Sequence, residues 1–156
     1  MVPPVSFRAV SVGSDGAVWA IGTNPVGGGY GIYQRSSNGW TPEPGGAVTI
    51  AVEPAGNPWI TNSAHQSLHW TGKAWTAVAG GGTDISVSSN GAVWLIGTNS
   101  VAGGYGIYHR VGNGWTAVAG GAVSIAVDPA GNPWIINAQH QILHWSGTGR
   151  TLISGN

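Results

Sequence analysis

The sequence has no cysteine, few charged residues and no long uncharged hydrophobic run. Without cysteine, no disulfide or thiolate chemistry is available. Charged residues make up 6% of the chain, and five basic side chains balance five acidic ones. Electrostatic steering onto nucleic acid or an anionic membrane is therefore not expected. No apolar segment can span a bilayer, so we expect a soluble chain without membrane insertion. The N-terminus lacks the features of a signal peptide, which leaves two alternatives for the compartment: an intracellular chain, or one from which a signal was removed.

Sequence that favours helices is also missing. Lysine, glutamate and leucine are scarce, and no segment has apolar residues at helical spacing, whereas glycine accounts for 28 of the 156 residues. Short runs rich in Val, Ile, Trp and Tyr alternate instead with clusters of Gly, Pro and Asn. This pattern is typical of β-strands joined by tight turns, because Gly and Asn adopt positive φ readily. The sequence therefore predicts an all-β protein.

The strongest positive feature is an internal repeat. Residues 12–59 overlay residues 87–134 with a constant shift of 75 positions and without a gap, and most overlaid residues are identical. Each half divides again, because Trp19, Trp59, Trp94 and Trp134 follow one another at spacings of 40, 35 and 40 residues. The chain thus consists of four units in the order A-B-A′-B′. Units of this length that contain several short strands are typical of propeller blades.

Each unit is predicted to form four antiparallel strands. In the second half these cover residues 84–89, 92–97, 106–110 and 115–119, and then 122–127, 133–137, 141–145 and 150–153. Four such strands repeated around an axis make a β-propeller. We therefore predict a single β-propeller domain over residues 1–156, with blades at approximately 7–46, 47–80, 81–121 and 122–156.

The alternation of A and B units limits how blades can close into a ring. Because A must follow B all the way round, a closed ring contains an even number of blades, and two copies of the chain give eight. The leading hypothesis is a head-to-tail homodimer that forms an eight-bladed ring, and a compact four-bladed monomer is the alternative. Arg150 stands where the first half has Trp75, which we interpret as the boundary of the final blade.

The A units resemble the tectonin repeat. In the second half, Ile-Ser-Val-x-x-Asn-Gly-Ala-Val-Trp begins at Ile85, Gly-Ile-Tyr-x-Arg at Gly106 and Asn-Gly-Trp-Thr-x-Val-x-Gly-Gly at Asn113, and the pattern recurs in the first half. Tectonin-type propellers are recognition modules, and several bind glycans, so the resemblance implies a lectin-like propeller without catalysis. The close match of the halves also resembles engineered symmetric propellers. That resemblance implies the alternative of a self-assembling scaffold with no native ligand.

The candidate ligand site lies in two glycine-rich connections, at residues 22–31 and 97–106. We expect them to be loops that join the second and third strands of the A blades at one mouth of the ring. Their ligand-binding candidates are Asn24, Tyr30, Asn99 and Tyr105, which offer the flat aromatic face and the amide groups that a sugar requires. The alternative is structural, with each tyrosine anchoring its loop and each asparagine bonding its own backbone.

Metal binding and catalysis have little support. His65 and His69, like His140 and His144, are four residues apart on what we expect to be one strand, which separates them by about 13 Å, too far for a single ion. The five acidic residues form no recognisable acid–base pair, and no serine lies in a nucleophile elbow. We therefore expect no metal, no cofactor and no enzymatic activity.

Overall fold

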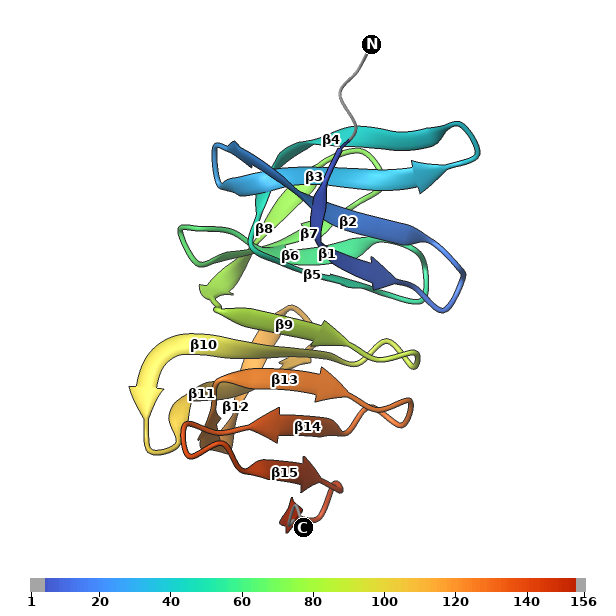
Figure 1. The fold of residues 1–156 in the computed structure, drawn as a ribbon. Helices are drawn as coiled ribbons and strands as arrows, with labels where there is room; N and C mark the ends of the chain where they lie inside the picture. The colour runs from blue at the N-terminus through green and yellow to red at the C-terminus, as the bar shows by residue number, and fades with distance from the viewer. Residues whose placement is uncertain (1–4, 154–156) are drawn as a thin grey trace. The chain divides into compact units, whose positions relative to one another are not determined.

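The computed structural model describes residues 5–153, and the regular elements of this part of the chain are all β-strands (Figure 1). The prediction of an all-β protein is confirmed. Sixteen strands in the described range form four antiparallel sheets, each of four strands in chain order. The chain divides into two compact units, Met1–Val78 (unit 1) and Ala79–Asn156 (unit 2). Within residues 5–153 there is no helix long and apolar enough to cross a membrane.

Unit 1 contains two sheets packed face to face. Their strands are β1 (Phe7–Val12), β2 (Val18–Val26), β3 (Gly29–Ser36) and β4 (Gly39–Ala47), followed by β5 (Thr49–Val52), β6 (Pro58–Thr61), β7 (Gln66–Trp70) and β8 (Trp75–Gly81), which continues into unit 2. A buried cluster that includes Trp19, Ile21 and Ile60 lies between the sheets. The Trp19 indole donates a hydrogen bond to the Gly56 carbonyl oxygen at 3.0 Å, so one large side chain both fills the core and joins the two sheets.

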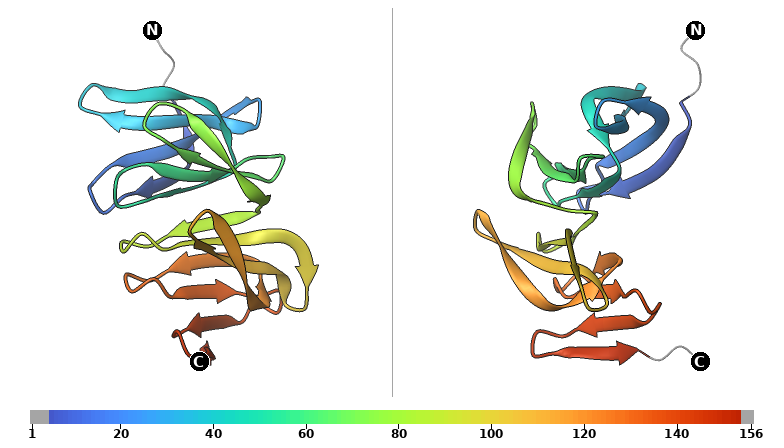
Figure 2. Two further views of the ribbon diagram at one scale, coloured as in Figure 1. Left: turned by 180° about the vertical axis from the view of Figure 1, so that it is seen from behind. Right: turned by 90° about the vertical axis from the view of Figure 1, so that its left-hand side faces the viewer.

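Unit 2 repeats this arrangement (Figure 2). Its strands are β9 (Asp84–Val87), β10 (Val93–Val101), β11 (Gly104–Val111) and β12 (Gly114–Ala122), then β13 (Ser124–Val127), β14 (Pro133–Ile136), β15 (Ile142–Trp145) and β16 (Arg150–Ile153). Trp94, Ile96 and Ile135 belong to its buried cluster. The Trp94 indole donates to the Gly131 carbonyl at 3.0 Å, the counterpart of the bond made by Trp19. The repeat in sequence is thus a repeat in packing.

The glycine-rich connections are not loops, so that prediction is wrong. β2 extends to Val26 and β3 begins at Gly29, which leaves only two glycines in the turn. The same hairpin recurs in β10 and β11. A register shift between Ile21 and Pro25 accommodates the residues that interrupt the alternating pattern, so pairing resumes beyond it. The predicted rim loops are therefore the paired ends of long hairpins.

The histidine pairs do not share a strand face, which corrects a second prediction. His65 and His140 lie in the turns before β7 and β15, with φ of 61°. Asn62 produces the first of these turns, because its side-chain oxygen accepts the backbone N–H groups of Ala64 and Gln66 at 3.0 and 2.9 Å. Asn137 does the same in unit 2. Asn62 and Asn137 therefore form turns at positions where the alternating sequence pattern predicts strand.

Candidate functional site

Asn24 and Asn99, two of the predicted ligand-binding residues, bend back over their own sheets. Each lies within the register shift of its hairpin, and its side-chain oxygen accepts a hydrogen bond from a tyrosine hydroxyl: Tyr33 to Asn24 at 3.1 Å, and Tyr108 to Asn99 at 2.9 Å. The asparagine lies against a glycine, because a Cβ on Gly106 would come within 2.6 Å of Asn99 Nδ2. The asparagines therefore pair with different tyrosines from the ones the sequence suggested.

Tyr30 and Tyr105, the other two candidates, lie three positions before the paired tyrosines and differ from each other in their surroundings. The guanidinium carbon of Arg8 lies 3.9 Å from the centroid of the Tyr30 ring, so a cation covers that aromatic face. Thr83 occupies the corresponding position in unit 2, and Tyr105 is 38% exposed. The structure therefore does not bring the four predicted residues into two equivalent sites, and their part in ligand binding stays a prediction.

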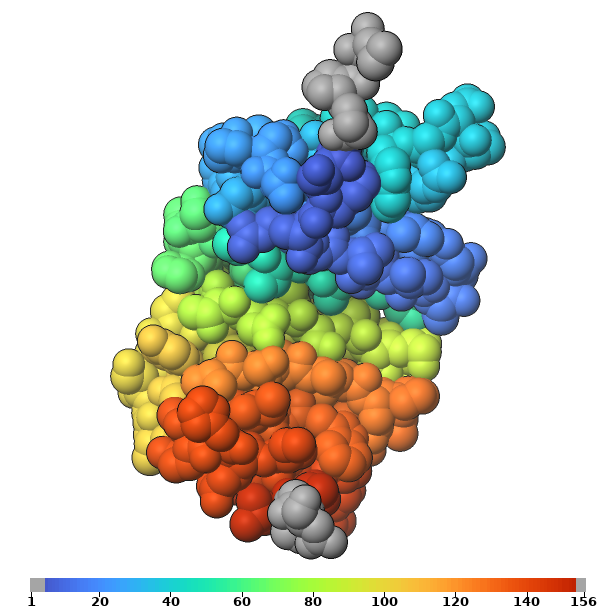
Figure 3. All heavy atoms as spheres, in the orientation of Figure 1, coloured from blue at the N-terminus to red at the C-terminus, as the bar shows by residue number. Residues whose placement is uncertain are grey.

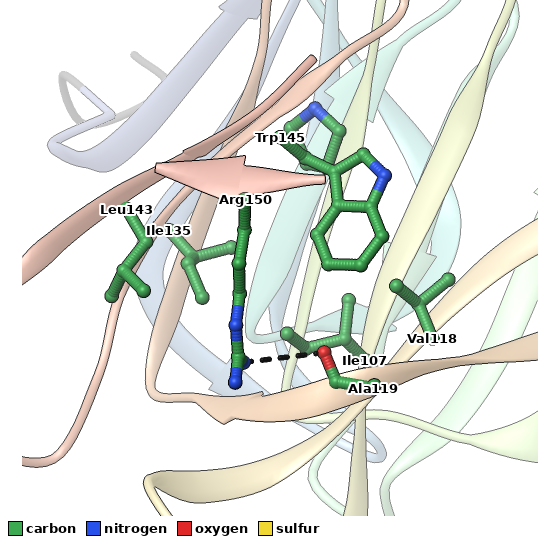
Figure 4. A pocket seen from close by; sticks show the side chains of 8 residues that line it. Ile107, Val118, Ala119, Ile135, Leu143, Trp145 and Arg150 are labelled. Atoms are coloured by element: carbon green, nitrogen blue, oxygen red, sulfur yellow. Dashed lines mark hydrogen bonds between the residues drawn. The ribbon is translucent and has the colours of Figure 1, made fainter. Parts of the chain in front are cut away.

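Unit 2 has a trough of about 420 Å³ over the outer parts of β10–β12. Asn99 and Tyr108 line it together, and Arg150 reaches it from β16. Arg150 donates a hydrogen bond to the Ala119 carbonyl at 3.3 Å, as Figure 4 shows. Sequence reasoning interpreted Arg150 only as a boundary residue and did not find this site. The signal was present, since Arg150 is a clear break in the repeat.

Arg150 stands where unit 1 has Trp75. Trp75 donates from its indole nitrogen to the Pro44 carbonyl at 2.7 Å, and its ring lies 5.0 Å from that of Trp70. Arg150 keeps the hydrogen bond to the equivalent carbonyl but replaces a bulky indole with a slender side chain beside Trp145 (Figure 4). The exchange preserves the link between neighbouring sheets and adds a positive charge to the trough.

A second, smaller cleft of about 200 Å³ shares Asn99 and Tyr108 with the trough. The other residues that line it are uncharged: Leu95, Thr98, Trp115, Gly80 and Gly81. The Trp115 indole donates to the Ala79 carbonyl at 2.7 Å, which fixes the orientation of that wall. Tyr108 therefore lines both the trough and the cleft.

The acidic residues of unit 2 lie elsewhere and serve the fold. Asp84 accepts the backbone N–H groups of Ile85 and Ile125 at 2.9 and 3.1 Å, which joins β9 to β13, and burial raises its pKa. Asp128 lies 3.2 Å from His144 Nε2, and its pKa is lowered mainly by a hydrogen bond from the backbone of Asn132. In the part of the chain that the structure describes, no three His, Cys, Asp or Glu side chains are grouped as a metal site requires.

No protein-family profile matches the sequence, and no curated protein matches it either. Solved structures do resemble it. YCF48 from Cyanidioschyzon merolae aligns with a TM-score of 0.65 and 14% identity over 100% of this chain and 58% of that protein. The structure of YCF48 bound to D1 peptide aligns with a TM-score of 0.62 and 15% identity over 97% of this chain and 54% of that protein. A calcium-binding regucalcin from Agrobacterium tumefaciens aligns with a TM-score of 0.54 and 14% identity over 90% of this chain and 52% of that protein.

A gluconolactonase from Xanthomonas campestris aligns with a TM-score of 0.52 and 14% identity over 92% of this chain and 56% of that one. All of these neighbours are β-propellers. At such low identity the likeness shows the fold alone. The chain is therefore a β-propeller protein with four four-stranded blades in its described part. It spans a little over half the length of the propellers that it matches.

Proposed function

We propose that this chain is a non-enzymatic β-propeller recognition module, lectin-like in type, which binds glycans in the trough of unit 2. The trough itself carries the proposal. Its volume of about 420 Å³ falls in the range of small-molecule sites, about 300–1,000 Å³. Tyr108 offers a flat aromatic wall to the apolar face of a pyranose ring. Asn99 and Arg150 offer amide and guanidinium N–H donors to its hydroxyl groups.

The chemistry of the trough favours binding over catalysis. Its lining contains one charged residue, Arg150, and no carboxylate. Asp84 and Asp128, the acidic residues of unit 2, are engaged in the backbone and histidine contacts described above. Propellers of similar fold include both an enzyme and a protein solved with a peptide, so the scaffold accommodates either role. The residues of this site are suited to holding a hydroxyl-rich ligand.

A glycan array with the purified 156-residue chain tests the proposal. Arg150→Trp should remove binding, because it restores the residue that unit 1 has at this place and fills the trough. Tyr105→Ala is the matched control, since Tyr105 is exposed but does not line the trough. Loss of binding in Tyr105→Ala alone would return the site to the residues first predicted from the sequence. A blank array for the native chain would refute glycan recognition.

Self-association is the second candidate function, and exposed apolar surface favours it. Val10 of β1 is 64% exposed in unit 1, and Trp134 of β14 is 37% exposed in unit 2. Ile136 and Ile142, on β14 and β15, are 39% and 42% exposed. Figure 3 shows the atoms of this orange part of unit 2 at the surface. In this proposal a second copy of the chain, joined head to tail as an eight-bladed homodimer, covers both apolar surfaces.

Analytical ultracentrifugation distinguishes the assemblies. A homodimer has twice the 15.8 kDa mass of the chain, or 31.6 kDa. Val10→Glu should shift the mass to that of a monomer, whereas Val111→Glu, at a residue 57% exposed on β11, should leave it unchanged. A native chain that sediments as a monomer refutes the ring. A stable dimer together with a blank glycan array would instead support the scaffold without a native ligand.

A further inference from the structure

Unit 1 holds one of its own aromatic side chains in a slot between two others. The Phe7 ring lies 4.5 Å from the ring of Trp40 and 5.7 Å from that of Tyr33, measured between centroids. The interplanar angles are 45° and 87°, so the contact with Tyr33 is edge-to-face. Such pairs stabilise beyond the burial of their area. Phe7 arrives at this slot on β1, an extended segment paired with β2.

Unit 2 has the same two walls without the ring between them. The shift of 75 positions places Tyr108 on Tyr33 and Trp115 on Trp40, but Gly82 on Phe7. The uncharged cleft of about 200 Å³ described above lies at these two walls. The chain does not have room to supply the ring itself, because a Cβ on Gly82 would collide with Leu95, which stands where unit 1 has the smaller Ala20. A side chain at position 82 is therefore blocked by Leu95, whereas the cleft meets solvent at the exposed residue Thr98.

We propose that this cleft of unit 2 binds an aromatic side chain presented by an extended peptide segment of a partner, beside Tyr108 and Trp115, the counterparts of the two rings that hold Phe7 in unit 1. The volume suits one ring, and the lining has no charge that would require a charged ligand. The Asn99 side-chain oxygen already accepts the Tyr108 hydroxyl, which reduces what the cleft offers to a sugar's hydroxyl groups. An aromatic side chain is therefore favoured over a saccharide here, and the site is separate from the proposed glycan trough.

The probe is a peptide copied from the chain itself, acetyl-Val-Ser-Phe-Arg-Ala-Val-amide (residues 5–10), carrying a fluorophore. Fluorescence anisotropy with the full 156-residue protein should show binding at one site per chain. The same peptide with Ala in place of Phe should bind about tenfold to hundredfold more weakly, the ratio that burial of one phenyl ring supports. Equal binding of the two peptides, or no binding of either, overturns the proposal.

Two further variants place the binding. Thr98→Trp adds a ring at the exposed rim of the cleft and should abolish binding, whereas Thr23→Trp makes the same change in unit 1 and should not. Phe7→Gly copies Gly82 and should raise the stoichiometry from one site to two, while Phe7→Leu, which keeps the slot filled, should leave one. Unchanged binding in Thr98→Trp overturns the assignment. The proposal is also overturned if the native protein binds methyl β-glucopyranoside and Thr98→Trp removes that binding, because the cleft would then be a saccharide site. Glycan binding in the trough is measured separately and should survive Thr98→Trp.

Discussion

Arg150→Trp should stabilise the protein, because the surroundings of a tryptophan are already present in unit 2. In unit 1, Trp75 packs on Trp70 at 5.0 Å and on Trp19 at 6.5 Å between ring centroids, and donates to the Pro44 carbonyl. The corresponding groups in unit 2 are Trp145, Trp94 and the Ala119 carbonyl, all present at equivalent positions. The new indole therefore replaces the guanidinium as hydrogen-bond donor and gains two aromatic neighbours.

The magnitude follows from the area that the indole buries. A fully buried aromatic side chain hides about 150–250 Å². Because Trp75 is only partly buried, we take about 100 Å² for the new residue, which at about 25 cal/mol per Å² is roughly 2.5 kcal/mol. The lost packing of the arginine stem offsets part of this gain. The expected net increase in the free energy of unfolding is about 1–2 kcal/mol, or about 2–8 °C in Tm for a chain of this length.

Urea unfolding at fixed protein concentration, followed by circular dichroism, measures the effect. Arg150→Trp should raise the midpoint without changing the slope of the transition. Trp75→Arg makes the reverse exchange in unit 1 and should lower the midpoint by at least as much, since it also leaves a void beside Trp70. The reasoning fails if Arg150→Trp is neutral or destabilising while Trp75→Arg is tolerated, because the two units would then not share the same packing.

Three other substitutions test single contacts. Trp19→Phe and Trp94→Phe should each cost about 1–3 kcal/mol, since each leaves a glycine carbonyl without its indole donor; unequal costs measured by urea unfolding would contradict the equivalence of the units. Burial lowers the pKa of His109, so the stability that this histidine contributes is present above about pH 6.5 and is lost as the pH falls through its folded-state pKa. His109→Gln, which copies Gln34, should remove that loss of stability between about pH 7 and about pH 5. A pH profile of unfolding that is the same in the variant would contradict this role of His109. Burial raises the pKa of Asp84, so the native chain should gain stability relative to Asp84→Asn as pH falls towards about 4, and a gain on raising the pH would contradict this assignment.

The repeat and the strand type could be predicted because each depends on local pattern. The spacing of the tryptophans and the alternation of apolar residues define four sets of four strands, and β16 covers the residues 150–153 that the sequence predicts. The hairpins of β2–β3 and β10–β11 were missed as paired structure. Their glycine and asparagine content is typical of loops, yet a register shift lets the strands resume pairing beyond Asn24 and Asn99.

The site was harder to predict than the fold, since it depends on which side chains share a face after that register shift. Tyr33 and Tyr108 were passed over in favour of Tyr30 and Tyr105, which lie three positions earlier. Asn99 accepts the hydroxyl of Tyr108, a tyrosine that the sequence reasoning did not select. No local pattern reveals that Arg8 covers Tyr30, because the contact brings β1 onto β3 across β2.

Unit 1 acts as an internal reference for unit 2. Two aromatic side chains of unit 1, Phe7 and Trp75, have no aromatic counterpart in unit 2, where Gly82 and Arg150 stand. The trough and the cleft described above both border Tyr108, and each has one of these exchanges beside it. The aromatic rings are absent from these two positions, yet the walls, Tyr108 and Trp115, keep their hydrogen bonds. A ligand ring that enters either hollow buries apolar surface against Tyr108, which is the physical reason to expect binding in unit 2.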